Sequence, residues 1–138
     1  VGRLDKDTEG LLLLTNDGEL AHRLLSPKRH VDKCYLVRTE KPLSETDLRA
    51  LETGVDIGDE KSTLPAKACL SPDGELLLTI REGRYHQVKR MLQAVGNQVV
   101  YLKRLSFGSL RLPEDLEIGQ FRPLTKEEQE RLQHDVAK

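Results

Sequence analysis

Short apolar runs alternate with amphipathic segments along the chain, and this pattern predicts strands interleaved with helices. Residues 31–40 alternate as a β-strand does, which places Tyr35 and Val37 on one face and their neighbours on the other. Leu11–Leu14 are apolar without alternation and are bounded by turn residues, so they predict a strand covered on both faces.

Helical periodicity is clearest in residues 85–95, where apolar side chains recur at positions i, i+3, i+4 and i+7. Three further helices are expected after the capping residues Asn16, Ser44 and Thr125. A hairpin is predicted within residues 67–82, and one or two strands within residues 97–112. Together these elements predict an α+β fold, with a mixed, largely antiparallel sheet flanked by helices.

The chain has 138 residues and a net charge of −1, which suits one domain but hides a local excess of positive charge. Residues 81–104 contain six basic residues and one acidic residue, a local charge of +5. Such a zone favours a phosphate-rich partner, and a solvated helix face is the alternative. No segment is long and apolar enough to span a membrane and no signal peptide is present, so a cytoplasmic protein is expected. The two cysteines are expected to be free, buried thiols.

Asp5 lies between Arg3 and Lys6, just before the apolar run. A loop anchored by a rigid strand can hold a reactive group still. A carboxylate needs no base to act as a nucleophile, provided that a nearby cation keeps it ionised. The alternative is an ordinary ion pair with a neighbouring cation, or a turn cap.

A second group of candidate residues lies in the sequence REGRYHQVKRML, at the start of the helix predicted for residues 85–95. Its basic residues can bind phosphates beside backbone N–H groups, or Lys89 can supply the cation that Asp5 needs. Tyr35 is the best-placed aromatic residue to stack on a single base, and a half-buried strand tyrosine is the alternative.

These segments are similar to the motifs of the pseudouridine synthases, in the form found in the ribosomal small-subunit (RsuA) family. The family's signature resembles GRLDKDTEGLLLLTND, its second motif resembles KCYLV and its third resembles EGRYHQVKRM. The resemblance implies the pseudouridine synthase catalytic fold and isomerisation of a uridine to pseudouridine in ribosomal RNA. The HQVK wording favours 16S rRNA of the small subunit. It also implies that the reaction uses no cofactor and no metal.

The resemblance also implies roles for individual residues. Asp5 matches the catalytic aspartate, Tyr35 the tyrosine that stacks on the uracil, and Lys89 the basic position that pairs with the aspartate. Arg3 matches the arginine that approaches the displaced nucleotide. The candidates for holding flanking RNA are Arg84, His86, Gln87 and Arg90, with Lys103 and Arg104 extending the track.

Members of this family usually carry an N-terminal S4-type RNA-binding module and further catalytic residues before the GRLD motif, whereas Val1 here lies just before it. We therefore expect residues 1–138 to form a partial catalytic domain, from a fragment or a nicked chain, with a sheet that lacks one or more strands. A monomer is expected, alone or with a separate N-terminal fragment of the same protein. Its partner would be ribosomal RNA, as such or within a partly assembled small subunit.

Two alternatives to a small-subunit enzyme stay open from the sequence. One is the same reaction on a uridine of large-subunit (23S) rRNA. The other is a non-catalytic RNA-binding or ribosome-assembly module, which would depend on Arg84 and Arg90 but not on Asp5. The presence of Asp5, Tyr35 and Lys89 together favours the enzyme, because a pure RNA binder has no use for an anion where phosphates approach.

Overall fold

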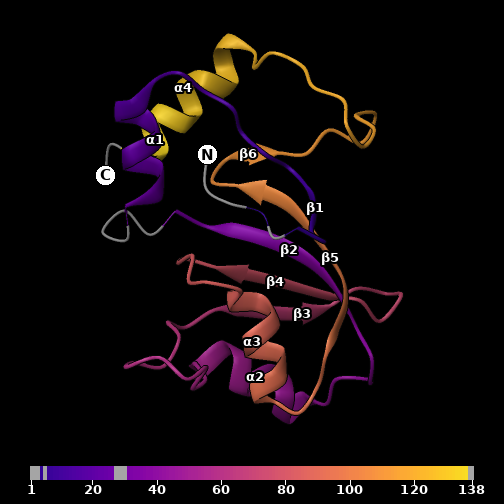
Figure 1. Cartoon of the computed structure of the whole chain (residues 1–138). Helices are drawn as coiled ribbons and strands as arrows, with labels where there is room; N and C mark the ends of the chain where they lie inside the picture. Colours follow the sequence, from indigo (N-terminus) through magenta and orange to yellow (C-terminus); the bar gives the residue numbers. More distant parts are fainter. Residues whose placement is uncertain (1–3, 5, 27–30, 137–138) are drawn as a thin grey trace.

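The computed structural model describes residues 4, 6–26 and 31–136, which form one mixed sheet with a pair of helices at each end (Figure 1). The strands are β1 (Glu9–Gly10), β2 (Lys33–Thr39), β3 (Lys67–Leu70), β4 (Leu76–Ile80), β5 (Val99–Phe107) and β6 (Leu110–Arg111). The helices are α1 (Gly18–Leu25), α2 (Glu45–Thr53), α3 (Gln87–Ala94) and α4 (Lys126–Asp135). None of the helices in this part of the chain is long and apolar enough to cross a membrane.

The strand order is β1-β5-β2-β4-β3, and β6 pairs with β5 off this path. Only the β1–β5 pair is parallel among the pairings described, and the other strands run antiparallel to their neighbours. The prediction of an α+β fold with a mixed, largely antiparallel sheet is therefore confirmed.

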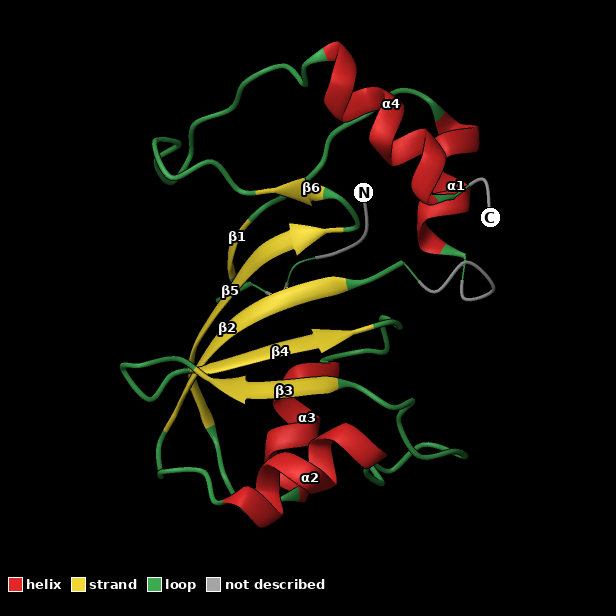
Figure 2. Cartoon of the chain, turned by 180° about the vertical axis from the view of Figure 1, so that it is seen from behind, coloured by secondary structure: helices red, strands yellow, loops and turns green. Residues whose placement is uncertain are grey.

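Two hydrophobic clusters hold the fold together. The helix pairs that take part in them, α2 with α3 and α1 with α4, lie on opposite sides of the molecule (Figure 2). The first packs α2 and α3 against β2, β4 and β5, and its fully buried members include Val37, Leu51, Leu78 and Met91. The second joins α1 and α4 to β6 and the end of β5, and its most buried members are Leu24, Phe107, Leu132 and Val136. Burial of a side chain of this size contributes roughly 1.5–3 kcal/mol, so the two clusters supply most of the stabilisation of the fold.

Several local elements agree with the sequence. Ser44 caps α2 and forms a capping box with Asp47, and Thr125 does the same for α4 with Glu128. Strands β3 and β4 form the expected hairpin, whose turn contains Gly74 with a φ of 82°. These features are local, so a few neighbouring residues suffice to predict them.

Three local predictions were wrong. Leu11–Leu14 are not a strand covered on both faces, because Leu11 and Leu13 are buried whereas Leu12 and Leu14 are exposed. The first helix is capped by Asp17 and not by Asn16, since the Asp17 carboxylate accepts the backbone N–H of Leu20. Both cysteines are free as expected, but neither is fully buried: Cys34 is half-buried and Cys69 is exposed.

Gly10 sets the position of the N-terminal segment against the sheet. Its φ is 110°, and a Cβ atom built there would lie 2.2 Å from the backbone oxygen of Arg104. The backbone of β1 can therefore approach β5 this closely only because residue 10 has no side chain. This contact anchors the chain that leads back through Thr8 and Lys6 toward residue 5.

Candidate active site

A cavity of about 630 Å³ lies beside the first hydrophobic cluster and reaches α1. Residues from five regions line it: Leu4, Lys6 and Thr8; Leu25; Lys33 and Tyr35; Ile80 and residues 83–88; Leu102 and Arg104. This volume is within the range of small-molecule sites.

Tyr35 contributes to the cavity from the middle of β2. The strand places Tyr35 and Val37 on the buried face, as the alternating pattern predicted. The Tyr35 side chain is 9% exposed, and it packs in the first cluster while also lining the cavity. Its position therefore suits contact with a base in the cavity, and the role of base stacking stays a prediction.

Lys89, in the first turn of α3, reaches the N-terminal segment. Its Nζ lies 2.5 Å from Oδ1 of Asp7, and this hydrogen bond lowers the pKa of the Asp7 carboxyl below its usual range. A contact across 82 positions of sequence joins the third motif to the first. Lys89 thus already stabilises a negative charge next to the segment that holds Asp5.

Asp5 and Arg3 lie outside the described residues, so the expected pairing of Asp5 with Lys89 is not tested here. The residues on either side of Asp5 are described, and both Leu4 and Lys6 line the cavity. Leu4 and Lys6 thus form part of the cavity wall. Within the described part of the chain, no group of three or more potential ligand residues could hold a metal ion.

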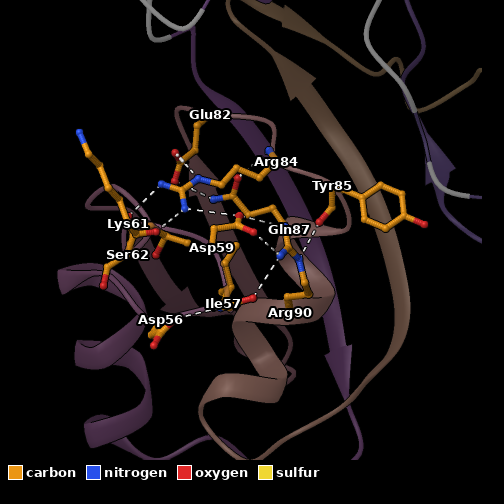
Figure 3. Close-up of polar contacts among 12 residues, drawn as sticks. Asp56, Ile57, Asp59, Lys61, Ser62, Glu82, Arg84, Tyr85, Gln87 and Arg90 are labelled. Carbon is orange, nitrogen blue, oxygen red and sulfur yellow. Dashed lines mark hydrogen bonds and ion pairs between the residues drawn. The ribbon is translucent and has the colours of Figure 1, made fainter.

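Arg84 fixes a loop against the start of α3 (Figure 3). Its guanidinium donates to the backbone oxygens of Lys61 and Ser62, at 2.6 and 2.8 Å, and to the Glu82 carboxylate at 3.1 Å. Gln87 is 4% exposed and holds the same turn, because its side chain accepts from the Arg84 backbone and donates to Glu82. Arg84 and Gln87 thus have protein partners for most of their polar atoms.

Arg90 completes this arrangement from the next turn of α3. It forms a bidentate pair with Asp59, at 3.0 and 3.2 Å, and donates to the backbone oxygens of Ile57 and Tyr85. Pairs of this geometry are the stronger kind of ion pair. RNA contacts were predicted for Arg84, Gln87 and Arg90, and these stay predictions. In the structure Arg84 and Gln87 line the cavity, while Arg90 holds the adjacent loop.

The loop that these arginines hold gives a stability prediction. Replacing Arg90 by lysine is expected to lower the free energy of unfolding by about 1–3 kcal/mol, because one ammonium cannot replace the bidentate pair and both carbonyl contacts. The matched control is Arg49→Lys, which changes an exposed arginine whose distance to Glu45 is 3.9 Å. Denaturant titration of both variants provides the measurement, and equal small losses would contradict the structural role of Arg90.

The same wall presents Tyr85 and His86 at the cavity. His86 has a φ of 47°, an unusual conformation for a residue with a side chain, and it occupies the N-cap position of α3. The Tyr85 ring is 75% exposed and meets the His86 ring edge-on, with centroids 4.0 Å apart. His86 was expected to contact RNA, and its place in the cavity wall is compatible with that role. No role was predicted for Tyr85, although an aromatic residue beside a basic helix start was a usable signal.

Lys33 and Arg104 are cavity residues whose position the sequence analysis missed. Arg104 was expected to extend the track of RNA contacts, and this stays a prediction; its side chain is 2% exposed and lies in the cavity wall instead of on the open surface. Its Nε donates to the backbone oxygen of Leu11, and its cross-strand partner is Tyr35. Lys33 could have been found from the period of two, since it precedes Tyr35 by two residues and shares its face.

Comparisons with known proteins show which protein family the chain belongs to. The sequence profile of a family described as RNA pseudouridylate synthase matches residues 1–94. This range includes the candidate residues Asp5, Tyr35 and Lys89. The chain therefore belongs to the RNA pseudouridylate synthase family.

Three individual relatives are similar to most of the chain. The chain is 57% identical to the uncharacterized RNA pseudouridine synthase YtzG of Bacillus subtilis, over 92% of its length and 55% of the relative's. It is 50% identical to ribosomal small subunit pseudouridine synthase A of Yersinia pestis, over 92% of its length and 54% of the relative's. The corresponding protein of Haemophilus influenzae is also 50% identical, over 95% of this chain and 57% of the relative's length. The chain thus spans a little over half the length of these relatives.

Solved structures agree with this fold. A crystal structure of a pseudouridylate synthase superimposes with a TM-score of 0.92 at 50% identity, and it covers 95% of this chain and 57% of the other. A chain of the archaeal box H/ACA sRNP Nop10–Cbf5 complex gives a TM-score of 0.51 at 20% identity. The match covers 84% of this chain and 40% of the other. At that identity the second likeness concerns the fold alone.

Proposed function

We propose that this protein isomerises a uridine to pseudouridine in the 16S rRNA of the small ribosomal subunit, in the cytoplasm. The observation that carries the proposal is the nucleotide-sized cavity, where Tyr35 lies in the wall beside the segment that holds Asp5. Lys89 reaches that same segment. The names of the relatives from Yersinia pestis and Haemophilus influenzae support the small-subunit substrate. In this proposal residues 1–138 belong to the catalytic domain.

The reaction exchanges one bond for another within a single nucleotide. The C1′–N1 bond breaks and its electron pair passes to the uracil. The base then turns, C5 bonds to C1′, the C5 proton leaves and N1 gains a proton. The sum is an isomerisation without net oxidation, so the proposal invokes no cofactor and no metal.

Each proposed catalytic residue has one task. Asp5 acts as the nucleophile that carries part of the nucleotide while the glycosidic bond is open, a task that carboxylates also perform in glycosidases. Lys89 favours the ionised form of Asp5, as it does for the Asp7 carboxyl. Tyr35 contacts the uracil ring and limits its movement while it turns.

RNA is held around the cavity in this proposal. Arg3 and His86 contact the displaced nucleotide and its neighbours, while Arg84, Gln87 and Arg90 contribute by fixing the wall that the RNA meets. A site of this kind requires the target nucleotide to leave its helix, since its reacting atoms are otherwise stacked. Binding is expected to weaken as salt rises, in proportion to the number of phosphates neutralised.

The direct test is to map pseudouridine in ribosomal RNA from cells with and without the gene, and in transcripts incubated with the protein. We expect one 16S position to lose its pseudouridine in the deletion strain and to regain it on incubation. Loss of a 23S position instead would replace the proposed substrate. An unchanged map, together with RNA binding that survives, would favour the non-catalytic RNA-binding module.

A further inference from the structure

Lys33 is a positively charged side chain inside the cavity that the mechanism above does not use. It is half-buried at the start of β2, on the same face as Tyr35. The absence of a side chain at Gly83 makes room for it, because a Cβ atom built there would lie 3.1 Å from the Lys33 Nζ. The two residues thus direct an ammonium group at the cavity.

Arg104 brings a second cation to the same place. Its side chain is 2% exposed and lines the cavity from β5. One guanidinium nitrogen, Nε, donates to the backbone oxygen of Leu11 at 2.8 Å. Its Nη2 is also buried and has no acceptor among the residues that the structure describes. A buried donor without an acceptor is costly, so an oxygen from outside the protein would be stabilising here.

The two cations lie close together against one aromatic ring. The Lys33 Nζ is 5.5 Å and the Arg104 Cζ 5.2 Å from the centroid of Phe107, which is fully buried. Burial, followed by repulsion from Arg104, lowers the pKa of the Lys33 ammonium. Two like charges held near one buried ring repel each other, so an anion beside them would be stabilising.

No carboxylate of the described residues forms a hydrogen bond or ion pair with Lys33 or Arg104. Glu82 favours the charged form of Lys33 from a distance. Its carboxylate, however, accepts hydrogen bonds from Arg84, from Gln87 and from the backbone of Leu64. No hydrogen bond or ion pair to the Lys33 Nζ is present in the described part of the chain. Buried charges in proteins are normally paired, so the missing partner is expected to be a ligand.

We propose that Lys33 and Arg104 form a subsite for a negatively charged oxygen of the target nucleotide. The proposal rests on the proposed function, because it concerns the nucleotide that enters the same cavity. Two oxygens of this kind exist on the substrate. One belongs to the phosphate of the flipped nucleotide, and the other is a uracil carbonyl oxygen that gains charge when the electron pair of the C1′–N1 bond passes to the base.

The test replaces Lys33 by methionine, which keeps an unbranched side chain only one atom shorter and removes the charge. Lys33→Gln serves as a second variant with a polar end, in case the apolar one packs differently. Lys67→Met is the matched control, since it removes a lysine on β3 that is exposed and outside the cavity. Arg104 is left intact because its contact with Leu11 also supports the fold.

Two measurements separate the two sources of the oxygen. Nuclear magnetic resonance titration gives the dissociation constants of uridine and of uridine 5′-monophosphate, and single-turnover assays on a 16S rRNA transcript give the rate of pseudouridine formation. We expect the Lys33 variants to lose about tenfold in one of these, as removal of a charged hydrogen bond does. Weaker binding of the monophosphate alone identifies the phosphate. A slower single turnover with unchanged binding of the monophosphate, or equally weaker binding of both ligands, identifies the uracil oxygen.

The proposal is overturned if both Lys33 variants stay within about threefold of Lys67→Met in all three quantities, since a loss of that size is under 1 kcal/mol. The binding titration involves no turnover, so it remains informative if the wild-type protein forms no pseudouridine. Absence of pseudouridine formation by the wild-type protein would refute the proposed function, and the binding data would still test the subsite. If the wild-type protein binds neither small ligand measurably, the single-turnover rate decides the question.

Discussion

Replacing Asp5 by asparagine is expected to abolish pseudouridine formation, with a loss of about a thousandfold or more in the single-turnover rate. Asparagine keeps the size and polarity of the side chain but cannot act as an anionic nucleophile. Its neighbours Leu4 and Lys6 line the cavity, so the substitution falls in the segment that the RNA would meet. The measurement is pseudouridine formed on a 16S rRNA transcript in excess of enzyme.

The matched control for this experiment is Asp73→Asn, which changes an exposed aspartate in the β3–β4 turn. Its rate is expected to equal that of the wild-type protein. RNA affinity of Asp5→Asn is expected to stay within about threefold, because a carboxylate contributes little to holding phosphates. A normal turnover rate in Asp5→Asn would remove the residue from the mechanism and leave the RNA-binding module as the better account.

Gly10→Ala is expected to lower the free energy of unfolding by roughly 3 kcal/mol or more. The new Cβ would lie 2.2 Å from the oxygen and 2.5 Å from the nitrogen of the Arg104 backbone. The φ of 110° adds strain for any residue with a side chain. Because backbone atoms of β5 cannot move aside cheaply, β1 must separate from its partner, and the segment before it loses its anchor.

Gly18→Ala is the control, since no atom lies within 4 Å of a Cβ built there and the residue opens α1. It is expected to change stability little, or to increase it slightly through the better helix propensity of alanine. Urea titrations give both free energies, and the turnover rate should fall with Gly10→Ala alone. Equal stability of the two variants would show that the close approach of β1 to β5 does not matter.

The family and most of the secondary structure were predictable from the sequence because their signals are local. The motif around Asp5 extends over sixteen consecutive residues, and the capping residues Ser44 and Thr125 act within one turn. The alternation around Tyr35 correctly gave the buried face of β2. The sequence alone identified Asp5 as the candidate nucleophile.

The remaining features depend on partners far away in the chain. Burial of alternate residues in Leu11–Leu14 follows from the packing of Leu11 and Leu13 in the second hydrophobic cluster, which no pattern within four leucines can reveal. A basic segment predicts phosphate binding for each of its arginines, but it does not show which of them pair with protein groups. Arg90 pairs with Asp59, which lies in a loop thirty-one positions away in the chain.

The sequence by itself therefore determined the family, the order of the elements and the identity of the candidate catalytic groups. Only the tertiary structure decided which positive charges brace a loop and which two line the cavity together. The physical reason is that electrostatic roles depend on distance and burial. Lys33 and Arg104 are separated by seventy-one positions in the chain, yet they share one aromatic ring.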